Sequence, residues 1–271
     1  QKPAEILVPA PRHLATREGR LRLPAAPRIR LAAASPERRI ALARHAAVFS
    51  GEIELLGGRP ARPVAAATLP AVTGPDLCLV LGGGEDEGYS LGIDGDGAVL
   101  RADSLAGIAQ GTATLLQLFV FADDGSSTLP FLQIEDAPQA AYRSVMIDVA
   151  RQPHSLGVLR DVIRLARLYK IRFVHLHLTD DQHFTFPFAP VTDQLKNNHV
   201  YARSDLIELV AYAEDRGVTL NLSIRQRPDL DSRRPGDLHR SVLRGHRSGR
   251  DVPVQARARI KAQNGDLRIQ A

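Results

Sequence analysis

The sequence has no tryptophan, one cysteine and very little lysine beside its arginine. A single cysteine excludes an internal disulfide framework. Cys78 lies in the apolar run 77–81, which is typical of a buried, unreactive thiol. The lysines are Lys2, Lys170, Lys196 and Lys261. A bias of this size toward arginine indicates GC-rich coding rather than a binding role.

Long apolar runs are also absent. No stretch of about 18 apolar residues occurs, so we expect no transmembrane helix and no membrane partner. The chain begins Gln1-Lys2-Pro3 without a methionine. That beginning fits a processed protein, and we expect a periplasmic or extracellular location although no signal peptide is visible. The 271 residues, 44% of them hydrophobic, allow one large or two ordinary globular domains.

The stretch 142–178 has the pattern of a βαβ unit. Residues 142–149 alternate as a strand does, and residues 171–178 form a second apolar run. Between them, residues 157–169 place apolar side chains at the 3-4 spacing of one helical face, with Ser155 as a predicted N-cap. Such units contain parallel strands with a right-handed crossover.

A second round of the pattern follows. We predict a helix at 205–216, capped by Ser204 and ended by Gly217, and then a strand at 218–224. Repeated βα units favour either a (β/α)₈ barrel or an open doubly wound sheet.

Polar residues follow the predicted strands where each strand ends. Asp148 and Arg151 follow the first strand, and Thr179, Asp180 and Asp181 follow the second. In both α/β architectures the carboxyl ends of parallel strands carry the functional site. These residues are therefore the candidate site.

Two histidines on the second strand leave an alternative open. His175 and His177 have the His-x-His spacing of a metal site, which would make the protein a metal-dependent hydrolase. Further ligands are not evident in the sequence. We therefore favour two core histidines and expect no cofactor.

The residues before the βαβ unit indicate a separate α+β domain. A helix at 35–50, a strand at 77–81, a hairpin around Asp94-Gly95-Asp96-Gly97 and a helix at 104–121 are predicted. The glycine run 82–84 is followed by three acidic residues, which would repel phosphate. It is therefore interpreted as a loop and not as a nucleotide-binding motif.

The βαβ stretch resembles the start of the catalytic barrel of family 20 glycoside hydrolases, the β-N-acetylhexosaminidases. The family pattern is Arg-Gly, then Leu-Asp-x-Ser-Arg-His, a helix, and His-Trp-His-Leu-x-Asp-Asp. This chain has Arg-Ser at 143–144, Ile-Asp-Val-Ala-Arg-Gln at 147–152 and His-Leu-His-Leu-Thr-Asp-Asp-Gln at 175–182. It departs from the pattern at Ala150, Gln152 and Leu176. The helix at 104–121 is similar to the one that closes the family's small domain before the barrel.

The resemblance implies roles for two residues. Arg151 matches the arginine that hydrogen-bonds the sugar hydroxyls of a bound N-acetylhexosamine. Asp180 matches the aspartate that supports a histidine further along the chain. Asp148 is interpreted as a hydrogen-bonded support and Arg143 as a structural arginine at the lower rim of the barrel. The implied mechanism is retaining and substrate-assisted: the 2-acetamido oxygen attacks the anomeric carbon, a glutamate protonates the leaving oxygen, and an aspartate holds the acetamido group.

The character of the sequence changes after residue 224. Residues 225–271 carry a net charge of +7, no aromatic residue and no glutamate. The catalytic Asp-Glu pair, the partner histidine of Asp180 and the tryptophans that the family places later in the barrel do not occur there. We interpret the tail as the translation of GC-rich DNA in a different reading frame from the one that encodes the family sequence. The alternative is a genuine basic tail that binds nucleic acid or another acidic surface, although no nucleic-acid partner is expected.

These observations predict three parts. Residues 1–137 form an α+β accessory domain, and residues 138–224 form the first part of a TIM-barrel glycosidase domain with about three βα units. Residues 225–271 form an irregular, arginine-rich and disordered tail. The expected function is removal of terminal N-acetylglucosamine or N-acetylgalactosamine from glycans or chitin oligomers, with little activity in this chain because the catalytic pair is absent. The alternative outside the enzymes is a non-catalytic carbohydrate-binding or scaffold protein.

Overall fold

A computed structural model describes residues 6–65, 74–178, 185, 200–225, 255–263 and 266–270. The chain divides into two compact units. The first unit consists of residues 1–141 together with two short later segments, Arg167–Lys170 and Asp215–Gly217. The second unit holds the remaining residues from Tyr142 onward.

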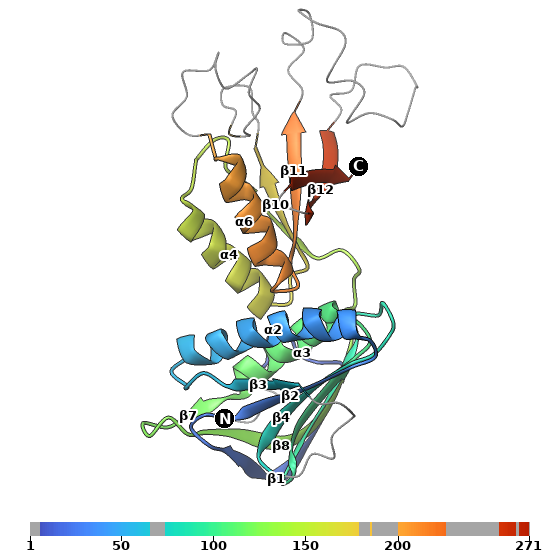
Figure 1. Cartoon of the computed structure of the whole chain (residues 1–271), viewed down its shortest axis with the longest axis vertical. Coiled ribbons are helices and arrows are strands. Elements are labelled where there is room, and N and C mark those ends of the chain that lie inside the picture. The colour runs from blue at the N-terminus through green and yellow to red at the C-terminus, as the bar shows by residue number, and fades with distance from the viewer. Residues whose placement is uncertain are drawn as a thin grey trace, which may run out of the picture. The chain divides into compact units, whose positions relative to one another are not determined.

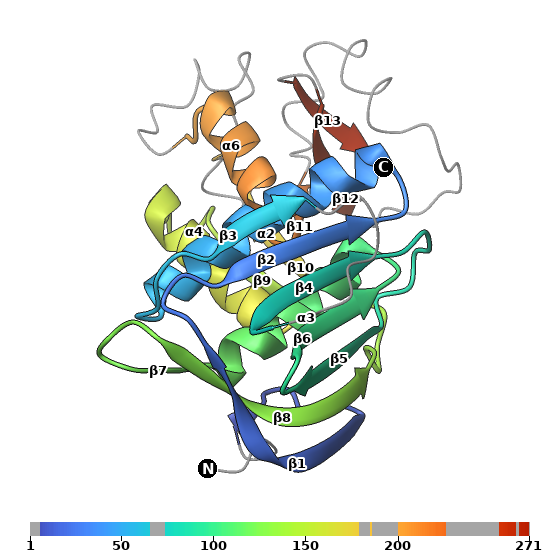
Figure 2. The same ribbon diagram turned by 60° about the horizontal axis from the view of Figure 1, so that its bottom comes forward.

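The first unit is built on an eight-stranded mixed sheet (Figures 1 and 2). Its strands are β1 (His13–Leu23), β2 (Arg28–Ala33), β3 (Arg62–Ala65), β4 (Asp76–Leu81), β5 (Tyr89–Asp94), β6 (Gly97–Ala102), β7 (Val120–Phe121) and β8 (Ser127–Asp136). The strand order is β1-β8-β5-β6-β4-β2-β3, with β7 paired to β8. The predicted hairpin is β5–β6, which is antiparallel and turns between Asp94 and Gly97.

Two helices, α2 (Pro36–Leu55) and α3 (Leu105–Leu118), lie along one face of this sheet (Figure 2). Each begins at a serine whose hydroxyl accepts a backbone N–H from the first turn, Ser35 for α2 and Ser104 for α3. The core between helices and sheet is made of leucine, isoleucine, alanine and phenylalanine. The two caps fix where the helices begin, and the apolar faces fix which side the sheet covers.

Gly107 lets α3 approach the sheet closely. A Cβ at this position would lie 2.5 Å from the carbonyl oxygen of Gly88 and 2.8 Å from the Cβ of Ala102. Both neighbours belong to the backbone or to a short rigid side chain, so neither can move aside easily. Any larger residue at position 107 would therefore push α3 away from the sheet.

The second unit contains the predicted βαβαβ run. Strands β9 (Ser144–Asp148), β10 (Phe173–His177) and β11 (Thr219–Arg225) pair in parallel and in sequence order. Helices α4 (Leu156–Leu168) and α6 (Arg203–Glu214) contribute leucines, isoleucines, valines and alanines to one core with β10 and β11 (Figure 1). Both crossovers therefore cover the same face of the sheet.

This arrangement decides between the two architectures that the sequence left open. In a doubly wound sheet the strand order reverses and helices cover both faces. Here β9, β10 and β11 follow one another without reversal, and α4 and α6 pack in one apolar cluster. The unit therefore has the arrangement of a partial (β/α)₈ barrel.

The tail is not wholly irregular, which corrects the prediction for residues 225–271. Strands β12 (Gln255–Gln263) and β13 (Asp266–Gln270) form an antiparallel pair, and β12 pairs antiparallel with β11. The sequence of β12 alternates small or apolar residues with arginine and lysine, and Asn264-Gly265 between the strands is a strong hairpin signal. Overall composition concealed this local period of two.

Two smaller points concern helices. The helix predicted from Asp205 begins earlier, at Arg203, and the amide of Leu206 donates to the carbonyl of Ala202 over 3.2 Å, so Ser204 lies inside the first turn. Gly217 ends the following turn with φ +71°, as predicted. None of the described helices is long and apolar enough to cross a bilayer.

Candidate active site at the strand ends of the second unit

Asp148 and His177 stand opposite each other at the carboxyl ends of β9 and β10. Beyond this pair, the amides of Val149 and Ala150 both donate to the carbonyl oxygen of His177, at 3.1 Å each. The chain leaving β9 is thus held against the end of β10. The parallel ladder places the loop that carries Arg151 at the edge of the sheet where α/β proteins bind their ligands.

The Asp148 carboxylate organises this loop. Its Oδ1 accepts the amides of Ala150 at 3.1 Å and Arg151 at 3.0 Å, and its Oδ2 lies 3.4 Å from Nε of Arg151. A carboxylate that caps the turn after its own strand has limited freedom to act as a base. Asp148 is therefore a hydrogen-bonded support, as interpreted from the sequence, although 30% of its side chain remains exposed.

Arg151 presents its side chain to solvent. The side chain is 77% exposed, while its own amide is fixed by Asp148. A guanidinium offers five donors in a planar fork, which suits the vicinal hydroxyls of a sugar ring. The backbone of Arg151 is anchored and its side chain is accessible, and a residue that binds a small polar ligand needs both.

Tyr201 fixes the far side of the same loop, and sequence reasoning missed it. Its hydroxyl donates to the carbonyl of His154 at 2.7 Å and accepts the amide of His154 at 3.2 Å. Burial raises the pKa of Tyr201, partly offset by its hydrogen bond to His154, so the hydroxyl keeps its proton. Thr185 in turn accepts the amide of Tyr201 at 3.1 Å and binds the carbonyl of Leu178 through its amide and hydroxyl. No local sequence signal marks the contact between Tyr201 and His154, which lie 47 positions apart.

The two histidines of β10 lie on the same face of the strand as Asp148. His175 is buried and His177 is partly exposed. Among the described residues, no group of three or more His, Cys, Asp and Glu side chains lies close enough to hold a metal ion.

Arg143 precedes β9, at the end of the sheet that corresponds to the lower rim of a barrel. The backbone carbonyl of Arg143 accepts the amides of Arg172 and Phe173 at 3.1 and 2.9 Å.

Asp180 is the other predicted site residue, and it lies outside the described residues together with Thr179 and Asp181. The structure thus brings Asp148 and Arg151 together at the strand ends. The role expected for Asp180 stays a prediction.

The glycine run 82–84 of the first unit is bound by the guanidinium of Arg38. Arg38 donates to the carbonyl oxygens of Gly82 at 3.0 Å and Gly83 at 3.1 Å, and also to the carbonyl of Asp103 at 3.1 Å. A phosphate-binding loop would present amides to its ligand, whereas these glycines present carbonyls to a guanidinium.

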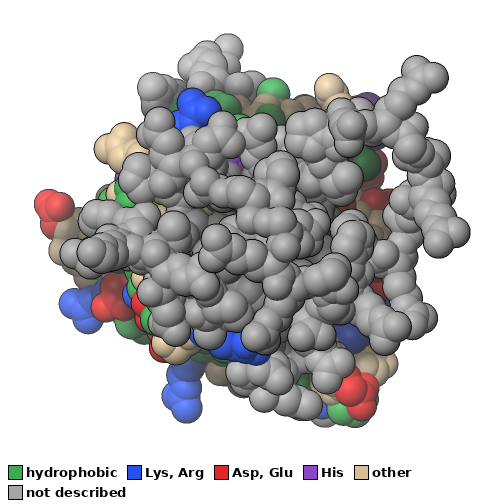
Figure 3. Space-filling model, turned by 90° about the horizontal axis from the view of Figure 1, so that it is seen from above, with side chains coloured by type: hydrophobic (Ala, Val, Ile, Leu, Met, Phe, Trp, Pro, Cys, Tyr) green, Lys and Arg blue, Asp and Glu red, His purple; other side chains and the backbone are tan. Residues whose placement is uncertain are grey.

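Charged side chains of both signs reach the surface. In the view of Figure 3, acidic and basic side chains of the described residues lie among one another. Residues 1–224 carry a net charge of −2, which agrees with this mixture.

Two family models match the chain. Residues 141–225 match the catalytic domain of glycosyl hydrolase family 20, and residues 4–137 match domain 2 of the same family. The two matches meet between the accessory residues and the βαβ run, and together they cover most of the chain.

Individual proteins of known name are similar as well. A β-N-acetylhexosaminidase from Cellulomonas fimi is 38% identical over 133 residues, covering 48% of this chain and 27% of that protein. A β-hexosaminidase from Vibrio furnissii is 28% identical over 236 residues, covering 79% of this chain and 36% of that protein. The solved structure of the family 20 β-N-acetylhexosaminidase from Streptomyces coelicolor superposes with a TM-score of 0.66 at 27% identity, covering 82% of this chain and 46% of that one. The chain thus spans less than half the length of each of these relatives.

Proposed function

Since the chain belongs to glycosyl hydrolase family 20, we propose that it is part of a β-N-acetylhexosaminidase. Such an enzyme would remove terminal N-acetylglucosamine or N-acetylgalactosamine from glycans or chitin oligomers. The observation that carries the proposal is Arg151, held by Asp148 at the carboxyl end of β9 with its guanidinium exposed. The names of the similar proteins support the same substrate class.

Arg151 would bind the non-reducing sugar. Its fork of donors matches adjacent ring hydroxyls, and the turn capped by Asp148 and clamped by Tyr201 would keep it in place. Asp180, two residues past Leu178, would orient an imidazole and stabilise its charged form. In this scheme neither residue transfers the proton to the leaving oxygen.

The printed sequence contains no glutamate after residue 224, where the family places its general acid. General acid catalysis contributes about 10²–10⁴-fold to a rate. We therefore propose that the 271-residue chain by itself binds the terminal sugar but hydrolyses it slowly or not at all.

Binding and turnover are measured separately to test this. Calorimetry with N-acetylglucosamine is expected to show saturable heat that Arg151→Ala abolishes. The matched control is Arg164→Ala, which removes another arginine of the same unit, one paired with Asp161 on the surface of α4. An aryl N-acetyl-β-glucosaminide then reports turnover.

The outcomes separate the competing functions. Saturable binding without turnover supports the proposal, but a carbohydrate-binding scaffold would give the same result. Replacing the residues after 224 by the remaining family sequence distinguishes the two, because only the enzyme would gain activity. Robust turnover by the pure 271-residue chain contradicts the missing-acid argument. Absence of heat, or binding that survives Arg151→Ala, contradicts the assignment of Arg151. Stoichiometric zinc in the purified protein would instead support a metal-dependent hydrolase.

A further inference from the structure

Two carboxylate side chains of the first unit are largely buried. Glu52, near the end of α2, and Asp136, at the end of β8, have side chains only 9% and 10% exposed. An ionised carboxylate in such surroundings is strongly unfavourable unless a cation and hydrogen-bond donors lie against it. The source of those cations therefore matters for the stability of the unit.

Arg167 supplies the cation for Glu52. Its Nε donates to both carboxylate oxygens, at 2.8 and 2.9 Å, and its Nη2 lies 2.7 Å from Oε2. The rest of the guanidinium is also used, since Nη1 donates to the carbonyl of Ala109 at 2.8 Å and Nη2 to the hydroxyl of Thr112 at 3.1 Å. With 1% of its side chain exposed, Arg167 is a fully enclosed partner.

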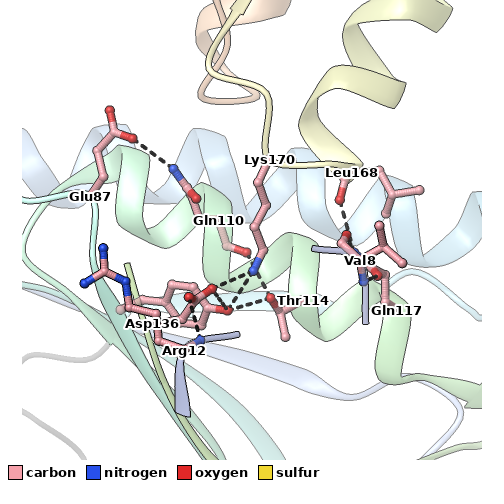
Figure 4. Close-up of polar contacts among 10 residues, drawn as sticks. Val8, Arg12, Glu87, Gln110, Thr114, Gln117, Asp136, Leu168 and Lys170 are labelled. Atoms are coloured by element: carbon pink, nitrogen blue, oxygen red, sulfur yellow. Dashed lines mark hydrogen bonds and ion pairs between the residues drawn. The ribbon is translucent and has the colours of Figure 1, made fainter. Parts of the chain in front are cut away.

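Lys170 supplies the cation for Asp136. Its Nζ lies 2.8 Å from Oδ2 of Asp136 and 3.0 Å from the hydroxyl of Tyr89 (Figure 4). That hydroxyl also bonds Oδ2 of Asp136 at 3.0 Å and the hydroxyl of Thr114 at 2.7 Å. Lys170 adopts φ +58°, an unfavourable backbone conformation for a residue with a side chain. Its side chain is held by the buried network despite this.

The residues between and near these two cations are bound in the same unit. The carbonyl of Leu168 accepts Nε2 of Gln117 at 3.1 Å, and Gln117 also bonds the amide and carbonyl of Val8 (Figure 4). The second late segment contributes Asp215, whose carbonyl lies 3.0 Å from Nδ1 of the buried His45. His45 reaches Thr112 through Nε2 at 2.9 Å, so Thr112 bonds Arg167 of the first late segment directly and is linked to Asp215 of the second through His45.

We infer that Arg167–Lys170 is a clasp on which the native state of the first unit depends. The contiguous residues 1–141 carry the sheet and both helices, but the cations for two of their buried carboxylates come from later residues. Arg167 pairs closely with Glu52, whose Oε1 also lies 3.9 Å from Nε of Arg216, and Lys170 pairs with Asp136. The first unit is thus stable only while the clasp is in place, which couples its folding to a segment of the family 20 catalytic region.

Amide hydrogen exchange on the full 271-residue chain tests the clasp, because it reports each unit separately. The variants are Arg167→Met and Lys170→Met, each alone and combined with its neutralised partner, Glu52→Gln or Asp136→Asn. Arg164→Met is the matched control, since this arginine lies one turn earlier and pairs with Asp161, with 41% of its side chain exposed. The readout is the exchange of the strand amides of β4 and β6, with β10 as the reference in the second unit.

Arg167→Met is expected to speed exchange in β4 and β6 on the order of a hundredfold, and Arg164→Met less than about threefold. Adding Glu52→Gln is expected to recover part of the protection, because it removes the uncompensated charge. The inference is overturned if Arg167→Met and Lys170→Met behave like Arg164→Met, or if each double variant loses the sum of its two single effects. If Arg167→Met is insoluble, a soluble Glu52→Gln/Arg167→Met variant supports the clasp. If neither is soluble, the Lys170 and Asp136 pair decides by the same two criteria.

Discussion

The two units differ in how their sheets end. In the first unit the outer strand β1 carries exposed Arg17, Glu18, Arg20 and Arg22, and the opposite outer strand, β3, is only four residues long and contains Pro63. In the second unit the outer strand β9 carries Met146 with 63% of its surface exposed, and its five residues include one charge, at its last position. Charges, prolines and short strands prevent further strands from adding to an edge.

Among the described residues, both outer strands of the first sheet have features that prevent further pairing, whereas in the second sheet the outer strand β9 has few of them. There β12 and β13 cover the edge of β11, and among the described residues β9 has β10 as its one neighbour. In the first unit the strongest polar contacts join buried groups, whereas in the second unit they hold the turn that carries Arg151. Stability effects are therefore expected to be large in the first unit and small at the candidate site.

Phe49→Ala is expected to have the largest effect. Phe49 is fully buried between α2 and the sheet and its ring lies 6.5 Å from that of Phe119, so its removal leaves a cavity that costs about 3–5 kcal/mol. Met146→Ala, on the exposed strand β9, is expected to cost less than about 0.5 kcal/mol. Denaturant-dependent hydrogen exchange of each unit measures both. Equal losses would contradict the contrast between the units.

Acid is expected to weaken the first unit through His45. Burial, together with the positive charges of Arg167 and Arg216, lowers the pKa of His45 to about 3, although the hydrogen bond to the Asp215 carbonyl acts in the raising direction. In the unfolded chain the imidazole titrates near its ordinary pKa of about 6.5, so below that pH the unfolded state binds more protons than the folded state. The stabilisation is complete above about pH 6.5 and falls by about 1.4 kcal/mol per pH unit as the pH drops toward 3.

Urea unfolding followed by hydrogen exchange of β4 and β6 between pH 7.5 and 4.5 measures this slope. Glu52 lies on the same helix as His45 and pairs with Arg167. Glu52 is present in both proteins compared below, so it does not account for a difference between their slopes. His45→Gln is the control: it is expected to be less stable at pH 7.5 but to show a flatter pH dependence. An equal slope in both proteins would assign the acid sensitivity to other groups.

Tyr201→Phe is expected to weaken one loop of the second unit. The change removes the hydroxyl that bonds both backbone groups of His154, and we expect a loss of about 1–3 kcal/mol confined to the loop after β9. Hydrogen exchange and limited proteolysis at residues 150–155 measure the loss. Tyr142→Phe, whose ring is half exposed and stacks on Phe173, is the control and is expected to change nothing.

Arg151→Ala is expected to have the smallest effect on stability, below about 0.5 kcal/mol, because its ion pair with Asp148 is open to solvent. The same change is expected to abolish binding of N-acetylglucosamine. Thermal unfolding and calorimetry on one preparation measure both quantities. A large loss of stability would show that Arg151 is a structural residue and would remove the reason to place it in the site.

Much of the fold was predictable because its signals are local. The 3-4 spacing of apolar residues located α4, the serine cap located the start of α3, and the Asp-Gly turn located the hairpin β5–β6. The strand ends also placed Asp148 and Arg151. The composition of the tail misled, since the alternation in β12 was present in the sequence and was outweighed by the density of arginine.

The rest of the candidate site was not predictable, because its contacts join distant residues. Tyr201 is an ordinary tyrosine before a helix, and only the packing of the chain brings its hydroxyl to His154. Asp180 was identified by resemblance and lies outside the described residues, so its role stays a prediction.

The sequence by itself determined the periodic elements, their order along the chain and the family to which they belong, because helix spacing, strand alternation and motif spacing are properties of neighbouring residues. Only the tertiary structure decided the tail strands that pair with β11, and the buried partners of Glu52 and Asp136. Arg167 lies 115 positions from Glu52, and Lys170 lies 34 positions from Asp136. A buried charge can be neutralised by any cation that the fold brings to it, and the linear order of residues does not specify which one that is.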